Sequence, residues 1–123
     1  MEYVATNNAP GAIGPYSQAV KSGGMLFTSG QIAINPESGN VEAQSIEEQT
    51  RQVCENLKAV VNAAGTSMDK VIKTVCFLAD IDDFAKFNEV YAEYFVSKPA
   101  RSCVAVKALP KGVLCEIELI AEL

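Results

Sequence analysis

The stretch 99-PARSCVAVKALPKGVLCEIEL-119 decides the fold that this sequence predicts. Two apolar segments, residues 101–108 and 114–122, lie on either side of a Pro-Lys-Gly turn, and both have the composition of strands. Arg101 lies in the first segment and Glu116 in the second. Charged side chains inside apolar strands indicate that one face of the sheet does more than pack against helices.

Local patterns upstream predict the first elements. Residues 17–34 read as two strands around a Gly-Gly connection suited to a tight hairpin. Ser45 and Glu48 form a capping box, and apolar positions at helical spacing then predict a helix that stops at Gly65.

The rest of the chain completes an α+β pattern. A β-branched strand is expected at 70–80 and an aromatic helix, after an aspartate cap, at 82–95. With an edge strand at the N-terminus, we expect a single mixed, mostly antiparallel sheet of about six strands with both helices on one face. Residues 108–113 either form a hairpin between the last two strands, or the 82–95 helix is a right-handed crossover that separates them.

Side-chain alternation assigns faces to the last two strands. In 114–122 the odd-numbered residues are apolar or small and belong against the helices, and in 101–108 we expect the even-numbered residues there. The far face would then carry Arg101, Cys103, Ala105, Lys107, Leu114, Glu116, Glu118 and Ile120. This mixture of charged and apolar side chains is typical of subunit interfaces, so we expect a homo-oligomer with clefts where the sheets meet.

Length and composition bound the class of protein. The 123 residues fit a single domain spanning 1–123. No apolar run approaches a membrane span and no secretory signal is present, so we expect no membrane partner and a cytoplasmic location. The four cysteines form no CxxC pair and are expected to be free thiols. A net charge of −5 disfavours nucleic acid as a partner.

The chain contains no histidine, the usual general base at neutral pH and the commonest metal ligand. Neither GxxxxGK[ST] nor GxGxxG occurs. We therefore expect no cofactor and no catalytic metal. Proton transfer would have to use a carboxylate, a tyrosine, a thiol, a lysine or ordered water.

Arg101 and Glu116 are the first candidates for chemistry. The guanidinium of Arg101 can clamp an α-carboxylate through two parallel hydrogen bonds, although an ion pair with Glu116 or Glu118 is the commoner role of such an arginine. Glu116 can polarise a water molecule or belong to that same pair. Burial would raise its pKa and a nearby arginine would lower it.

Five further residues are candidates for lining a site. Cys103 offers a thiol or a backbone carbonyl, although a small buried side chain is its commoner role. Tyr16 follows a Gly-Pro turn that can present its phenol. Ser29 places a hydroxyl beside Gly30, which marks either a bulge or the close approach of a ligand. Asn88 can cap a helix, bind a ligand or face water.

Four segments, 13-IGPYSQAV-20, 27-FTSGQI-32, 87-FNEVYAEYF-95 and 99-PARSCVAVKALPKGVLCEIE-118, together resemble the Rid family of reactive-intermediate deaminases, formerly called the YjgF-type family. The resemblance covers essentially the whole chain. It implies a chorismate-mutase-like subunit in a homotrimer with clefts between subunits. It also implies cofactor-independent hydrolysis of 2-imino acids, such as 2-iminobutanoate and 2-iminopropanoate, and of enamines such as 2-aminoacrylate, to 2-keto acids and ammonia.

The resemblance also assigns roles by position. Arg101 matches a carboxylate-binding arginine, and Glu116 matches a glutamate that holds the attacking water together with the backbone carbonyl of Cys103. The positions that match cleft-lining residues are Tyr16, Ser29, Gly30 and Asn88. The connector 96–100 is shorter than is common in the family, and Cys115 replaces a branched aliphatic residue, which bears on the preferred substrate size.

These parts suit the chemistry because an iminium carbon is already electrophilic, so orientation against one placed water can suffice without a strong base. The alternative function is a metabolite-sensing or regulatory binding protein, since relatives have been linked to purine regulation and translation inhibition. RNA cleavage is a third hypothesis, disfavoured by the acidic charge and the missing histidine.

Overall fold

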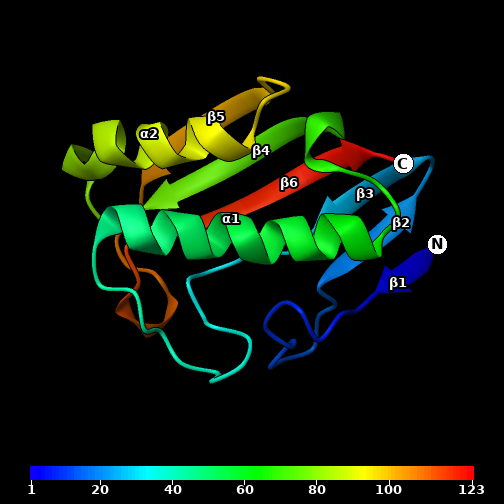
Figure 1. Ribbon diagram of the computed structural model, residues 1–123, viewed down its shortest axis with the longest axis horizontal. Helices are drawn as coiled ribbons and strands as arrows, with labels where there is room; N and C mark the ends of the chain where they lie inside the picture. The colour runs from blue at the N-terminus through cyan, green and yellow to red at the C-terminus, as the bar shows by residue number, and fades with distance from the viewer.

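The computed structural model describes residues 1–123, and its strands and α-helices follow the predicted order (Figure 1). The elements are β1 (Glu2–Val4), β2 (Ala19–Ser22), β3 (Met25–Thr28), α1 (Ile46–Ala63), β4 (Val71–Leu78), α2 (Phe84–Tyr94), β5 (Ala100–Ala105) and β6 (Cys115–Glu122). Neither α-helix combines the length and the apolar composition that crossing a bilayer requires.

All six strands form one sheet in the order β1-β2-β3-β6-β4-β5. The β4–β5 pair is parallel and every other pair is antiparallel. Since β4 lies between β5 and β6, the hairpin alternative for 108–113 is wrong, and α2 is the crossover that separates the last two strands. The predicted mixed sheet with two helices on one face is confirmed (Figure 1).

The helix ends follow from local hydrogen bonding. Ser45 Oγ accepts from the Glu48 backbone N–H at 3.1 Å and donates to Glu48 Oε1 at 2.9 Å, so the predicted capping box is present. Gly65, with φ of +87°, follows the end of α1 in the left-handed region that favours glycine. No side chain caps α2. The aspartate that caps a backbone N–H here is Asp80, at the short turn before that helix.

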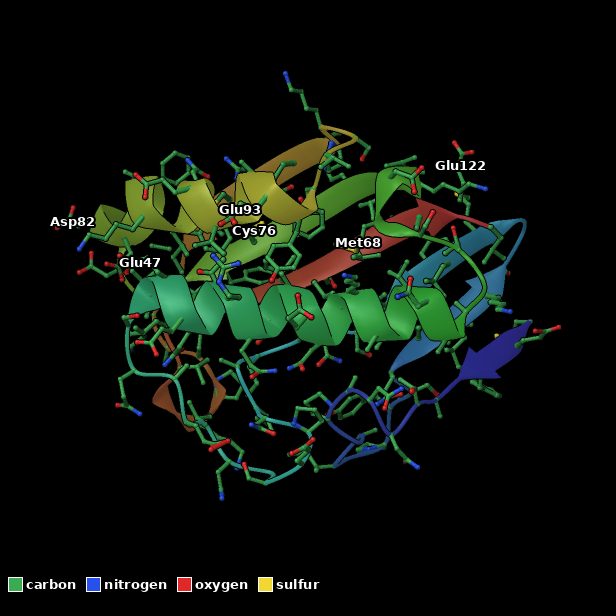
Figure 2. The ribbon with its side chains drawn as sticks, viewed as in Figure 1. Glu47, Met68, Cys76, Asp82, Glu93 and Glu122 are labelled. Atoms are coloured by element: carbon green, nitrogen blue, oxygen red, sulfur yellow. The ribbon has the colours of Figure 1, made fainter.

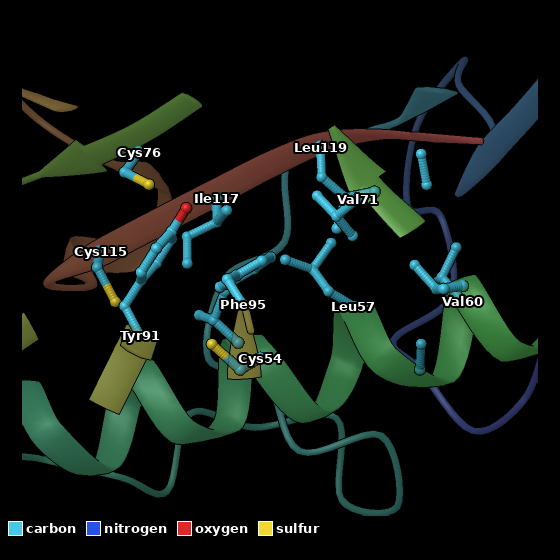
Figure 3. Close-up of a cluster of buried hydrophobic side chains, with 14 of the residues drawn as sticks. Cys54, Leu57, Val60, Val71, Cys76, Tyr91, Phe95, Cys115, Ile117 and Leu119 are labelled. Carbon is cyan, nitrogen blue, oxygen red and sulfur yellow. The ribbon is translucent and has the colours of Figure 1, made fainter. Parts of the chain in front are cut away.

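The core lies between the helices and the sheet. Leu57 from α1 and Phe87 from α2 are fully buried, and Figure 3 shows side chains from both helices meeting Ile117 and Leu119 of β6. The alternation predicted for 114–122 is confirmed, because its odd-numbered residues are buried whereas its even-numbered ones from 114 to 120 are half-buried on the far face.

The prediction for the faces of β5 is wrong. Arg101 lies beside Thr74 in the ladder and Cys103 lies beside Cys76, and both β4 residues are fully buried under the helices. Directly paired residues share a face, so Arg101 and Cys103 face the helices together with Ala105.

The far face of β5 instead carries Ser102 and Val104, the latter 47% exposed. An edge strand has one neighbour and few apolar contacts, so its sequence alternation says little about which face is inside. Glu116 consequently lies on the face of the sheet opposite to Arg101.

Candidate functional site

Six of the seven predicted site residues fall into two groups on different surfaces of the chain, and the seventh, Cys103, lines neither of the two cavities described next. Tyr16, Ser29, Gly30 and Glu116 line one cavity of about 610 Å³, here called the Glu116 cavity. Asn88 and Arg101 line another, of about 570 Å³, here called the Arg101 cavity. A single subunit therefore does not bring all of the predicted residues together.

Arg101 is held by residues of α2. Its Nη1 donates to Asn88 Oδ1 at 2.7 Å, and its Cζ lies 4.8 Å from the ring centroid of Tyr91 and 5.4 Å from that of Phe84. The two ion pairs of the structure, Lys21–Glu2 and Arg51–Glu93, do not involve Arg101, and no carboxylate oxygen lies within 4.0 Å of its guanidinium. The internal ion pair considered from the sequence is absent, and the charge of Arg101 is available to an anion.

The helix positions explain why three side chains reach Arg101. Phe84, Asn88 and Tyr91 are spaced i, i+4 and i+7, which places them on one side of α2. Tyr91 is fixed at its far end, because its hydroxyl lies 2.7 Å from Thr74 Oγ1, and Thr74 is the ladder partner of Arg101. Figure 3 shows the Tyr91 ring between α2 and the sheet.

Tyr91 is also held by other rings and stays neutral. It stacks on Phe95, with ring centroids 4.3 Å apart, and lies 5.8 Å from Phe87. Burial raises the pKa of Tyr91 to about 12, so its phenol keeps its proton at physiological pH. It therefore supplies an aromatic face to Arg101 without supplying a counter-charge.

Cys103 faces the helices and packs at the border of the core. Burial raises the pKa of its thiol, opposed by the charge of Arg101, so the side chain behaves as a small half-buried group rather than as an activated thiolate. All four cysteines are free, as predicted. Burial also raises the pKa of Cys76 (Figures 2 and 3) to about 12 and that of Cys115 to about 11.

Glu116 and Glu118 are two half-buried carboxylates that line the Glu116 cavity. The pKa of Glu116 is raised, first by burial and then by the neighbouring charge of Glu118. A carboxylate with a raised pKa is a better proton acceptor near neutral pH than an ordinary glutamate. Lys111, which sequence reasoning missed, also lines this cavity, in a turn where its φ is +58°.

Gly30 makes room for Glu116. A β-carbon at Gly30 would lie 2.8 Å from Glu116 Cδ, closer than real side chains approach. Backbone hydrogen bonds in both directions between Gln31 and Ile117, at 2.9 and 3.2 Å, hold this segment against β6. The backbone also bulges here, because three residues separate Phe27 from Gln31 whereas only two separate Ile117 from Ile120, their partners in β6. The bulge considered for Gly30 is therefore present, and the glycine also leaves space for the Glu116 carboxyl.

Ser29 and Tyr16 differ in how free they are. The Ser29 hydroxyl donates to the Ser17 backbone carbonyl at 2.5 Å, so it already ties two loop segments together. Tyr16 is 49% exposed, and its hydroxyl makes only a long contact, 3.4 Å, with the Ile13 backbone N–H. Its phenol is therefore available at the rim of the Glu116 cavity.

The sequence predicts Phe84 and Tyr91 only as part of an aromatic helix at 82–95 and carries no signal that they contact Arg101. Their contacts with Arg101 depend on the pairing of β5 with β4. No set of three or more histidine, cysteine, aspartate or glutamate side chains is arranged to hold a metal ion.

Comparisons with known proteins cover nearly the whole chain. The family model described as Endoribonuclease L-PSP matches residues 6–123. The RutC family protein PH0854 of Pyrococcus horikoshii is 58% identical over 121 residues, which span 98% of this chain and 96% of the relative.

Two further relatives have solved structures. YyfA from Yersinia pestis, described as a protein of unknown function of the conserved Rid protein family, is 51% identical, with a TM-score of 0.96 over 99% of this chain and 98% of that one. A protein of Escherichia coli K12 named "Putative reactive intermediate deaminase TdcF" is 49% identical over 122 residues, spanning 96% of this chain and 94% of the relative. The crystal structure of E. coli TdcF with bound serine has a TM-score of 0.95 over 100% of this chain and 99% of that one.

Proposed function

The chain belongs to the Endoribonuclease L-PSP family, and from this membership we propose that it is a cofactor-independent deaminase. Its substrates are 2-imino acids, such as 2-iminobutanoate and 2-iminopropanoate, and the enamines that tautomerise to them, such as 2-aminoacrylate. Its products are 2-keto acids and ammonia.

The observation that carries this proposal is the uncompensated charge of Arg101. The guanidinium is oriented by Asn88 and two aromatic rings, and no carboxylate of the chain neutralises it. A planar guanidinium with free donors matches the α-carboxylate that every proposed substrate carries. The serine-bound structure of TdcF concerns a ligand that carries the same group.

The opposite faces of Arg101 and Glu116 support a site shared between subunits. One small substrate cannot contact both side chains in a single subunit, because the sheet separates them. In the proposed homotrimer, the Arg101 cavity of one subunit meets the Glu116 cavity of the next, an arrangement that closes a ring of three equivalent contacts.

In the proposed reaction, Arg101 pairs with the substrate carboxylate and Glu116 accepts a hydrogen bond from the attacking water. As the water oxygen bonds to the iminium carbon, the C=N π electrons move to nitrogen and a proton of the water passes to Glu116, which leaves a carbinolamine. Glu116 then returns that proton to nitrogen. The C–N bond breaks as the hydroxyl oxygen forms the C=O bond, and the hydroxyl proton passes to the departing ammonia, which leaves the keto acid and ammonium. The raised pKa of Glu116 suits both transfers.

The other residues would orient these groups. The Cys103 backbone carbonyl would share the attacking water with Glu116, and Tyr16, with a free phenol, would close the rim. Ser29 and Gly30 would shape the wall on which Glu116 lies. The advantage of such a site is orientation of the reactants, which can lower the barrier by several kcal/mol without a strong base.

A coupled assay tests the activity. Threonine or serine dehydratase generates the imine in the presence of the purified protein, and the appearance of the keto acid is followed. We expect acceleration over the buffer-catalysed rate with the wild type and none with Arg101→Ala. An unaccelerated wild-type rate would refute the proposal.

A mixing experiment tests the shared site. Arg101→Ala and Glu116→Gln trimers are each expected to be inactive. After unfolding and refolding together in equal amounts, about a quarter of the interfaces would combine an intact arginine with an intact glutamate. Recovered activity near that fraction supports the shared site, whereas no recovery by correctly reassembled trimers contradicts it.

A carboxylate-sensing protein is the second candidate, because the Arg101 cavity alone can bind an acid without turning it over. Calorimetry with 2-ketobutyrate distinguishes the two functions, since binding without imine hydrolysis would favour sensing. The family description names an endoribonuclease. RNA cleavage is measured with the same protein preparation, and cleavage that belongs to this site should be lost in the Arg101→Ala variant. The net charge of −5 argues against RNA cleavage.

A further inference from the structure

Asn88 contacts Arg101 through a neutral group. Its Oδ1 accepts from the guanidinium at 2.7 Å, a short distance for such a bond, and it is the side-chain hydrogen-bond acceptor that Arg101 has in the chain. An aspartate of nearly the same shape would accept the same hydrogen bond more strongly. The choice of a carboxamide therefore needs an explanation other than holding the arginine in place.

We infer that Asn88 is a positioning residue that must be uncharged, and that with the rings of Phe84 and Tyr91 it forms a neutral cradle that orients Arg101 without neutralising it. This inference rests on the proposed function, because it concerns how Arg101 discriminates carboxylates from uncharged ligands. It also revises the expectation that Asn88 mainly contacts the substrate.

The neutrality of the cradle follows from each of its members. A carboxamide oxygen carries only a partial charge, so one hydrogen bond fixes the guanidinium plane and leaves the full positive charge. The rings of Phe84 and Tyr91 attract the cation through their faces and occupy none of its N–H donors. Four of the five guanidinium N–H groups stay free of side-chain acceptors, enough for two parallel bonds to a carboxylate.

The cradle is rigid because one helix carries all three members. Phe84, Asn88 and Tyr91 share a side of α2, and Tyr91 is fixed by its hydroxyl contact with Thr74 at 2.7 Å and by stacking on Phe95. Since Thr74 is also the ladder partner of Arg101, the backbone that carries the arginine and the ring that supports it are locked to each other.

Two other roles for Asn88 compete with this one. The first is purely structural, in which any side chain that keeps the hydrogen bond would serve. The second is direct contact with a ligand through Nδ2, which has no hydrogen-bond partner in the chain. Under the first role Asn88→Asp would leave the binding of both acid and amide intact, and under the second it would remove a donor to the ligand and weaken the binding of both.

The test compares an acid with its neutral amide. Dissociation constants for 2-ketobutyrate and 2-ketobutanamide are measured by calorimetry with the wild type and with Asn88→Asp. We expect Asn88→Asp to weaken acid binding about 10- to 100-fold, the range for a hydrogen bond to a charged group, and to leave amide binding within about twofold. The ratio of the two constants is the readout.

Each outcome has a defined meaning. If Asn88→Asp leaves acid binding intact, or weakens acid and amide equally, the neutral cradle is refuted in favour of a structural or direct-contact role. If the wild type itself binds acid and amide equally, the carboxylate clamp fails and the proposed function fails with it. The two failures are therefore distinguishable.

A second variant guards against a folding defect. Phe84 is 38% exposed, so Phe84→Leu keeps the apolar contact and removes the aromatic face with little risk to the core. We expect weaker acid binding by about two- to fivefold, with amide binding unchanged, since an exposed cation–π contact contributes about 0.5–1 kcal/mol. Unchanged acid binding in a folded Phe84→Leu protein would show that the Phe84 ring is not part of the cradle.

Discussion

Two arginines of this protein contact α2, but a carboxylate neutralises only one of them. Arg51 on α1 donates to Glu93 Oε2 of α2 at 2.9 Å and lies 5.9 Å from the Tyr94 ring, and Glu93 is labelled on α2 in Figure 2. Arg101 also contacts α2 and aromatic rings there, but its polar partner is the carboxamide of Asn88.

The difference extends to the carboxylates. Glu93 is exposed and paired with Arg51, whereas Glu116 is half-buried, unpaired and separated from Arg101 by the sheet. We call Arg51 and Glu93 the closed pair, and Arg101 and Glu116 the open pair. A closed pair stabilises a contact and leaves no charge for a ligand. An open pair leaves both charges available to a ligand, and the missing ion pair makes the fold somewhat less stable.

The largest test of this comparison removes each arginine in turn. We expect Arg101→Ala to lower imine hydrolysis about 100-fold or more, because an oriented charge can contribute ~3 kcal/mol to the transition state. Arg51→Ala should leave the rate within about twofold, since its charge is already neutralised. If Arg101→Ala and Arg51→Ala lost equal activity in the coupled dehydratase assay, the distinction between the open pair and the closed pair would be wrong.

The second test displaces the carboxylate of the open pair. In Gly30→Ala the new methyl group collides with the Glu116 carboxyl, which must swing away. We expect kcat to fall about tenfold while KM changes little, because Arg101 still binds the substrate. A matched loss in acid binding, or a large fall in the melting temperature, would show that Gly30 serves the fold instead.

The third test concerns pH. Glu116 must be ionised to accept a proton, and because its pKa is raised, the acid limb of kcat/KM should lie at higher pH than an unperturbed glutamate would give. Glu118→Gln removes the second cause of that shift, so the acid limb should move to lower pH while the plateau stays nearly unchanged. A pH–rate profile in which this limb does not move would argue against Glu116 as the titrating group.

The same pKa shift has a consequence for stability, with a definite sign. A carboxyl with a raised folded-state pKa contributes most below the ordinary glutamate value and loses that contribution as the pH rises through the raised value. Glu116→Gln should therefore unfold at an equal or higher temperature than the wild type at neutral pH, although we expect it to be inactive. Destabilisation at neutral pH would mean that the carboxylate has a structural partner.

The smallest effect is expected at the closed pair. Glu93→Gln breaks an exposed ion pair, which contributes little to stability, and it frees the charge of Arg51. We expect a small fall in melting temperature and no change in imine hydrolysis. The informative result would be new carboxylate binding at Arg51, which would show that an unpaired arginine beside a ring suffices without the cavity that surrounds Arg101.

Sequence patterns predicted the fold well for elements whose two faces differ clearly in burial, and for helix ends. The β6 segment alternates between buried and half-buried residues, so its faces were predicted correctly, and the Rid resemblance is confirmed by the family match. The capping box at Ser45 and the glycine stop at Gly65 were also predicted, because both depend on neighbours a few residues away.

The position of Arg101 was not predictable in the same way. Its strand, β5, lies at the edge of the sheet and pairs only with β4, so no alternation records which side is inside. Arg101 faces the helices, where Asn88 and two aromatic rings of α2 contact it. These residues lie close to β5 only because the β4-α2-β5 crossover places the helix over the strand. The roles of Tyr16, Ser29 and Cys103 remain predictions, because they concern contacts with a substrate and a neighbouring subunit.

The β4-α2-β5 crossover, residues 71–105, carries Arg101 with every side chain that surrounds it, whereas Glu116 depends on segments from both ends of the chain. The half of the site proposed to recognise the acid is thus a contiguous segment, here called the crossover cassette. Chimaeras that exchange this cassette between relatives should transfer preference for the acid group while retaining the recipient's hydrolytic half, so the two halves can be re-engineered one at a time.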